Sequence, residues 1–286
     1  MWFGPTARND GSMQPPARAP IGLSRRALLA LGVTVGSVGA ATLVGCSGGR
    51  STPEPVAYCT SRASLTQHSG LRDAAFVYDV DQRPTSFWFN SGFFGQLGGW
   101  LDDYLKLAGT SRPDQVWTYG SWLDGQPQCN SWHDAGRAFD LSRLVTGGAV
   151  QVSCRYDIWS TYTGAKLEYF RTRYWAMAAS LHLHFEYVLT HLYNADHHNH
   201  IHIDNGASGS RLSTFHADSV SQVQAVQAIL THLWNKPVPV SGRWDRETRN
   251  ATGDVLDGTK VGGTIDDGDD HWHTFLRRSA VRRSSS

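Results

Sequence analysis

The alternation of polar and apolar residues is strictest at residues 199–204, which read Asn-His-Ile-His-Ile-Asp. Successive side chains of a β-strand face opposite sides, so His200, His202 and Asp204 are predicted to share one face. The two isoleucines between them would pack into a hydrophobic core on the other face. The pattern therefore predicts a strand that carries a row of imidazoles ending in a carboxylate.

Periodic segments elsewhere predict the elements around this strand. A long helix is followed by a hairpin, and the histidine-rich segment forms the hairpin's second strand. This order predicts an α+β fold, with a small antiparallel sheet and flanking helices around the histidines and a small C-terminal helical segment. The predicted helices lie near residues 99–108, 165–182 and 223–230, and the predicted strands at 115–119, 137–141 and 185–192, with a turn at 194–196.

The N-terminal part has the pattern of an export signal. An uncharged apolar stretch over residues 27–45 follows the arginine pair at 25–26 and ends in Leu-Val-Gly-Cys. The pair resembles a twin-arginine signal, and the ending resembles the lipobox of bacterial lipoproteins, whose cysteine is acylated. We expect a signal peptide over 1–45, lipidation of Cys46 and a flexible tether over 46–57. Because about 20 apolar residues can span a bilayer, a permanent transmembrane anchor is the alternative.

The charge balance and the cysteines bear on the possible partners and disulfides of the protein. With 26 basic against 25 acidic residues, the chain lacks the charge excess of a nucleic-acid-binding surface, so we expect no nucleic-acid partner. Cysteines of an exported protein can pair. A disulfide between Cys129 and Cys154 would enclose the motif at 131–140 and contribute about 3 kcal/mol. Cys59 would stay free or replace either partner, and spacing alone leaves the connectivity open.

A second motif supplies metal-ligand residue types. His133 and Asp140 lie seven residues apart in the segment Ser-Trp-His-Asp-Ala-Gly-Arg-Ala-Phe-Asp. Together with His202 they would provide three zinc ligands and leave the fourth position open, as in a catalytic zinc site. Zinc held in this way favours hydrolysis of a peptide bond. The remaining nearby histidines are expected to be structural or exposed, namely His182, His184, His191 and His198.

A lone His-x-His pattern often occurs by chance. The joint occurrence of two spaced motifs in the expected order is less easily explained in this way. Each also fits a known pattern at its fixed positions. The first fits S-x-H-x-x-G-x-A-x-D through Ser131, His133, Gly136, Ala138 and Asp140, and the second contains His197-x-x-His200-x-His202.

This pair of motifs resembles the lysostaphin, D-Ala-D-Ala metallopeptidase and Hedgehog superfamily of zinc folds, and within it the bacterial extensin-like C-terminal family. Over residues 58–212 the resemblance implies a zinc metallopeptidase-like domain, with Zn²⁺ as cofactor, that hydrolyses peptidoglycan stem peptides. We expect it to be a monomer. The resemblance implies that His133, Asp140 and His202 bind zinc, that His200 acts as general base or oxyanion stabiliser, that His197 lies at the cleft rim and that Ser131 supports the site.

Two groups that the related dipeptidases carry are missing. Their Tyr-Arg pair corresponds here to residues 119–122, Tyr-Gly-Ser-Trp, which contain no arginine, and the catalytic glutamate is also absent. Charge stabilisation would then have to come from His197, His200, Arg112 or Arg155. Two alternatives therefore stay open: a non-catalytic, zinc-stabilised cell-wall-binding protein, and a zinc-sequestering surface lipoprotein.

The C-terminal part resembles a small helical peptidoglycan-binding unit over residues 218–275, through Gly242, Trp244, Thr248 and Ala251. A plain helical cap is the alternative. We expect the unit's third helix to be lost in the Gly/Asp-rich stretch that follows residue 252. The basic, serine-rich tail at 276–286 is expected to be disordered.

Overall fold

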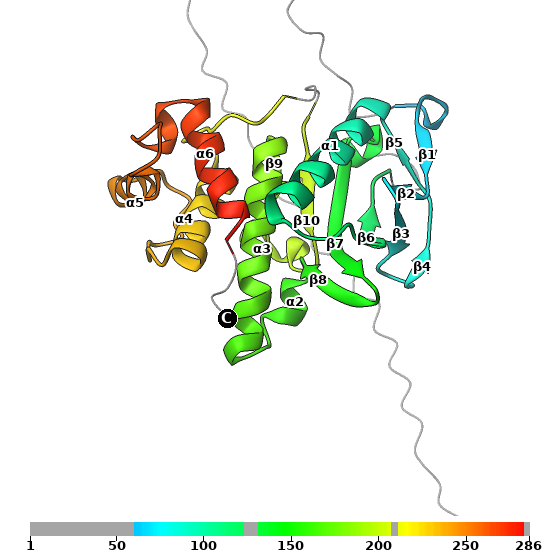
Figure 1. Ribbon diagram of the computed structural model, residues 1–286. Helices are drawn as coiled ribbons and strands as arrows, with labels where there is room; N and C mark the ends of the chain where they lie inside the picture. The colour runs from blue at the N-terminus through cyan, green and yellow to red at the C-terminus, as the bar shows by residue number, and fades with distance from the viewer. Residues whose placement is uncertain (1–59, 123–130, 207–210, 283–286) are drawn as a thin grey trace, which may run out of the picture. The chain divides into compact units, whose positions relative to one another are not determined.

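The histidine-rich strand belongs to the larger of two β-sheets in a computed structural model, which describes residues 60–122, 131–206 and 211–282 (Figure 1). The smaller sheet pairs β1 (Thr66–His68) with β5 (Phe87–Phe89). The strands of the larger sheet are β2 (Gly70–Leu71), β3 (Ala74–Tyr78), β4 (Arg83–Pro84), β6 (Gln115–Gly120), β7 (Ala138–Thr146), β8 (Ala149–Ser153), β9 (Tyr187–Leu189) and β10 (Ile201–Asp204).

The larger sheet is mixed. Its order is β2-β3-β6-β7-β10-β9, with β4 beside β3 and β8 beside β7. Its strand pairs are antiparallel except for β3 and β6, which run parallel. The expected α+β fold with an antiparallel sheet and flanking helices is thus confirmed, with one parallel pair that the sequence did not predict. The physical reason is the helix between them, α1 (Ser91–Ala108), because parallel neighbours require a long crossover connection.

Six α-helices and four short 3₁₀ helices accompany the sheets in the described residues. The predicted helix at 165–182 is confirmed as α3 (Gly164–His184). The helix predicted near 99–108 is α1, which begins eight residues earlier, where the Asn90 side chain accepts a 3.2 Å hydrogen bond from the amide of Phe93. The others are α2 (Tyr156–Trp159), α4 (Val220–Trp234), α5 (Arg246–Leu256), α6 (Asp269–Ala280), η1 (Arg62–Ser64), η2 (Trp132–Ala135), η3 (Ala195–His197) and η4 (Ile265–Asp267).

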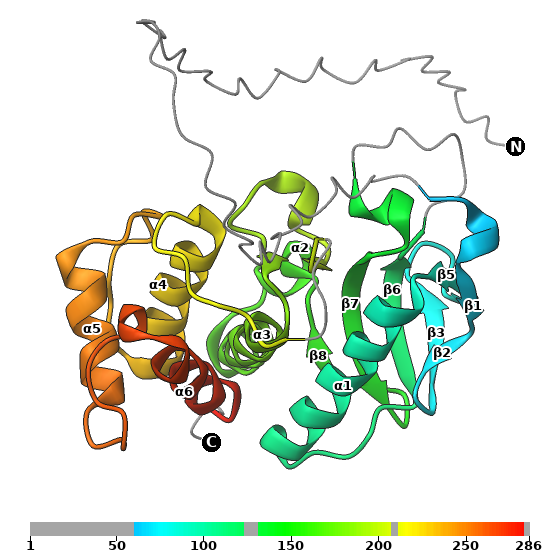
Figure 2. The same cartoon turned by 90° about the horizontal axis from the view of Figure 1, so that it is seen from above.

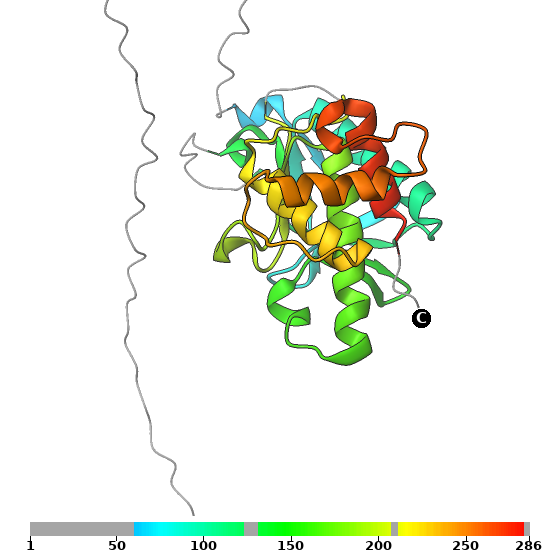
Figure 3. The ribbon, with the colours of Figure 1, turned by 90° about the vertical axis from the view of Figure 1, so that its left-hand side faces the viewer.

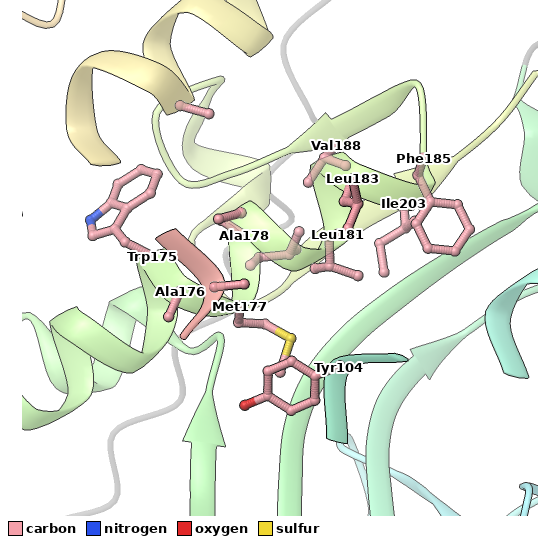
Figure 4. Close-up of a cluster of buried hydrophobic side chains, with 14 of the residues drawn as sticks. Tyr104, Trp175, Ala176, Met177, Ala178, Leu181, Leu183, Phe185, Val188 and Ile203 are labelled. Atoms are coloured by element: carbon pink, nitrogen blue, oxygen red, sulfur yellow. The ribbon is translucent and has the colours of Figure 1, made fainter. Parts of the chain in front are cut away.

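The core lies between the larger sheet and the helices α1 and α3 (Figure 2). Ile201 and Ile203 of β10 are fully buried there, as the alternation predicted. Figure 4 shows Ile203 near Leu181 and Phe185, and Tyr104 of α1 beside Met177 of α3. Burial of these side chains stabilises the sheet. Because side chains alternate along a strand, the polar residues of the same strands then lie on the other face of the sheet.

Helices α4 and α6 pack against α3 and share its hydrophobic core, and α5 packs against α4 and α6 (Figures 1 and 3). Within the predicted unit, Gln227 of α4 accepts hydrogen bonds from the amides of Ser241 and Gly242, both at 2.9 Å, and donates to Thr248 at 3.1 Å. Gly242 has a φ of 69°, and a Cβ there would lie 2.8 Å from Val220. These contacts explain the glycine and threonine of the sequence motif.

Two expectations for the C-terminal part are wrong. The third helix is present as α6, because Trp272, Phe275 and Leu276 form an apolar face that is fully buried. The same packing orders the first part of the expected disordered tail, since α6 continues to Ala280, which is 3% exposed. Residues 283–286 lie outside the described residues.

Several predictions from the sequence concern residues outside the described ones. These are the signal peptide, the tether, the lipidation site Cys46, and the cysteines Cys59 and Cys129. Cys154 is buried and forms no disulfide within the described residues, and burial raises the pKa of its thiol. None of the described helices combines the length and hydropathy that a bilayer crossing requires.

Buried neutral histidines should make the fold sensitive to acid. Both ring nitrogens of His182 are buried and have no hydrogen-bond partner within the described residues, and burial lowers its pKa from 6.5 to about 3. Its contribution to stability is therefore full above pH 6.5 and is lost as the pH falls towards 3, by about 1.4 kcal/mol per pH unit. In urea titrations with a chelator present, the free energy of unfolding should decrease from pH 7 to pH 4.

The replacement His182→Leu should reduce this pH dependence, because leucine fills the site without an ionisable group. The control His198→Gln, at a half-buried histidine, should keep the parent's dependence. An unchanged slope in the His182→Leu variant would contradict the assignment.

Candidate metal centre

A cross-strand pair on the polar face of the sheet provides two of the three candidate metal ligands. His202 of β10 lies directly opposite Asp140 of β7 in the antiparallel register, and its Nδ1 is 3.0 Å from Asp140 Oδ1. Neighbouring residues of both strands are fully buried on the opposite face, so the period of two places both side chains on the polar face. The predicted strand 137–141 is thus confirmed, although β7 continues to Thr146.

His133 reaches this pair from the 3₁₀ turn η2, just before β7. The Ser131 hydroxyl caps the turn by accepting from the amide of His133 at 3.3 Å. The turn ends at Gly136, whose φ is 62°, and a Cβ there would lie 2.9 Å from the amide nitrogen of Asn90. Glycine is therefore required at this position, which fixes where His133 enters the site.

The three predicted ligands converge. His133 Nε2 lies 3.3 Å from Asp140 Oδ1 and 3.3 Å from His202 Nδ1. Ligand atoms about 2.0–2.1 Å from a tetrahedral zinc lie about 3.3 Å from one another, so the spacing of these atoms fits such an ion. In the described part of the chain, this is the one group of three or more His, Cys, Asp or Glu residues with metal-ligand spacing.

Outer hydrogen bonds orient both imidazoles. His133 Nδ1 donates to the backbone carbonyl of Ser121, and His202 Nε2 is 3.0 Å from Asp204 Oδ2. Asp204 is itself held by the amide of Gly206 at 2.9 Å. Partners of this kind fix the tautomer of a metal-binding histidine and direct its other nitrogen at the ion.

The electrostatics of the centre also favour a cation. Burial acts to lower the pKa of His202, but hydrogen bonds to Asp140 and Asp204 raise it to about 10, so the metal-free ring carries a proton. Burial acts to raise the pKa of Asp140, but His133 and His200 hold it well below its usual value. The pocket thus stabilises one positive charge between its carboxylates, and a bound metal would replace the proton.

Two further imidazoles border the three donors. His200 Nε2 lies 3.4 Å from Asp140 Oδ1, and the His197 ring centroid is 5.2 Å from that of His200. Asn199 and Asn194 hold the respective Nδ1 atoms at 2.6 Å, which leaves each Nε2 available. Burial lowers the pKa of His200, and burial with the neighbouring imidazoles lowers that of His197 to about 4. Both rings are therefore neutral at pH 7.

The other residues considered from the sequence have structural partners. Arg112 is paired with Asp102 at 3.1 Å, and Arg155 with both Asp79 and Asp157 at 3.1 and 2.7 Å. Tyr119 interacts electrostatically with Arg155, and its ring centroid is 5.7 Å from that of His200. His182 and His184 are buried, and the half-buried His191 stacks on Tyr156 with ring centroids 3.9 Å apart, which agrees with the expected structural role.

Several residues of the site were not found from the sequence. They are Asn194, Asn199 and Tyr119, together with the backbone carbonyl of Ser121. The two asparagines are the only ones with a recognisable signal, since each lies within three residues of the histidine that it orients. Comparison of the chain with protein-family models, curated proteins and solved structures finds no match.

The geometry predicts one metal ion per chain. Purified protein reconstituted with zinc should contain about one equivalent of zinc by elemental analysis. The His202→Ala variant should lose this zinc, because the two remaining ligands would hold it only weakly. The control His216→Ala removes an exposed histidine outside the cluster and should retain the metal. Undiminished zinc in His202→Ala would show that other residues are the ligands.

The outer carboxylate should tune the affinity for the metal. Asp204→Asn keeps the shape of the side chain but removes its charge from His202, and the affinity for zinc should fall about 10- to 100-fold in competition with a chelator. Asp218→Asn, at an exposed carboxylate, should have the parent's affinity. Equal affinities in all three proteins would contradict a role for Asp204.

Proposed function

We propose that the protein is a zinc-dependent peptidase that cleaves peptide bonds of the cell wall. The observation that carries this proposal is the three-donor set of His133, Asp140 and His202, next to the neutral imidazole of His200. Three protein ligands leave a coordination position for a reactant, which a structural four-ligand site does not.

Each residue has a distinct task in this proposal. His133, Asp140 and His202 would hold the ion. Asp204 would orient the imidazole of His202, and the Ser121 carbonyl would orient that of His133. Zinc, when bound, supplies a Lewis acid that activates water and polarises a carbonyl. His200, kept neutral and oriented by Asn199, would accept a proton at Nε2, and His197 would stabilise charge at the rim. Ser131 would act through the turn that it caps.

The compartment and substrate class rest on the sequence. The twin-arginine and lipobox-like segment that ends at Cys46 supports an exported protein held on the outer face of the membrane by lipid. The helical unit at 218–275 and the motif resemblance support peptidoglycan stem peptides as substrates. A D,D- or L,D-carboxypeptidase or an endopeptidase would suit this site.

One observation favours a second candidate, a zinc-stabilised protein that binds wall peptides without cleaving them. Arg155, the nearest arginine identified from the sequence, is bound by the carboxylates of Asp79 and Asp157. Its charge is therefore compensated before any substrate arrives. In this candidate the metal would order the site, and His197 and His200 would donate or accept hydrogen bonds.

Turnover of muropeptides separates the two candidates. Zinc-loaded protein should release D-alanine or cleave cross-links, and a chelator should stop the reaction. His200→Ala should retain zinc but lose about 10²–10⁴-fold in rate, because the proton acceptor is removed. His198→Ala serves as the neighbouring control. Absence of product with zinc present would exclude the peptidase, and a zinc-dependent thermal shift on muropeptide binding would then support the binding protein.

A further inference from the structure

A polar cavity lies where Arg211, Leu212 and Thr214 meet the N-terminal part of α6, and Asn205 also lines it. Its volume is about 300 Å³. It shares no residue with the three-donor set or with the flanking histidines. Its lining includes Glu186, Arg211, Leu212, Thr214, Asp269 and His273.

Two opposite charges in this lining are uncompensated. Within the described residues, the guanidinium of Arg211 and the carboxylate of Asp269 form neither a hydrogen bond nor an ion pair, although they line the same cavity. They are too far apart to pair with each other. The cavity therefore presents the hydrogen-bond donors of the Arg211 guanidinium at one end and the acceptors of the Asp269 carboxylate at the other.

The remaining walls add acceptors near Asp269. Glu186 Oε1 is bound by His216 at 2.7 Å, whereas its Oε2 receives only a long 3.4 Å bond from the Thr214 amide. His273 Nε2 donates to the Ser213 carbonyl at 2.7 Å, and this bond leaves its Nδ1 unengaged. Asp269 and His273 lie one helical turn apart on α6 and therefore share a face. Acceptors thus outnumber the single cation, Arg211.

We propose that this cavity binds a free α-amino acid. The α-carboxylate would take the guanidinium fork of Arg211, which matches a carboxylate in two hydrogen bonds. The α-ammonium would donate to Asp269 and to Glu186 Oε2, and a small side chain would contact Leu212. A volume at the lower end of the range for ligand sites suits a ligand of this size. The proposal goes beyond the peptidase function and does not depend on it.

Isothermal titration calorimetry of the full chain with alanine tests the site. Acetate and methylammonium serve as comparison ligands, because acetate carries only the carboxylate of an amino acid and methylammonium only its ammonium group. Alanine should bind at least tenfold more tightly than either fragment. Arg211→Gln and Asp269→Asn should each weaken alanine binding at least tenfold without changing the melting temperature. Asp270→Asn, at the adjacent exposed carboxylate outside the cavity, is the matched control and should bind as the parent does.

Each of three titration results would overturn the proposal, as would the chelator result below: no binding of alanine at millimolar concentration, acetate binding as tight as alanine, or equal effects of Asp269→Asn and Asp270→Asn. Acetate equivalence would indicate a simple anion site at Arg211. Repeating the titration with a chelator distinguishes this site from the metal centre. Alanine binding that survives the chelator supports an independent site, whereas its loss would assign the ligand to the metal.

Discussion

The pairing of β7 with β10 is the constraint on which both the core and the candidate site depend. One register places Asp140 opposite His202, and Phe139 opposite Ile203. A shift by one residue would move His202 into the core and both isoleucines of β10 onto the polar face. Burial of the apolar face therefore stabilises the donor geometry as well.

Much of this arrangement could be predicted from the sequence, because period-two alternation reports directly on the two faces of a strand. The positions of His200, His202, Asp204 and the two isoleucines follow from it. The parallel pairing of β3 with β6 does not, since it depends on how α1 crosses the sheet. Helix α6 was missed because its apolar face has only a few large residues, and Gly/Asp-rich chain precedes it.

The outer shell of the site is harder to predict than its donors. A donor must be one of a few residue types, whereas an orienting group can be any acceptor that the fold brings near. The Ser121 carbonyl is twelve residues from His133 in the chain, and backbone carbonyls leave no signal in a sequence. Asp204 was recognisable only because it continues the alternation of His200 and His202.

The distribution of the donors along the chain links the metal to folding. His133 comes from a turn, and Asp140 and His202 come from strands that only the folded sheet brings together. An unfolded chain offers no such set, so the free energy of binding a metal here would add to the stability of the sheet.

A site of this kind would serve a peptidase and a binding protein equally well. What distinguishes them is the group that would stabilise developing negative charge. Arg143 and Arg155 are already bound to the carboxylate of Asp79, and Arg137 donates to the Gly206 carbonyl at 2.8 Å. In the proposed peptidase, catalysis would therefore depend on the metal together with His197 and His200, whose lowered pKa values favour the neutral rings that can form hydrogen bonds and transfer protons.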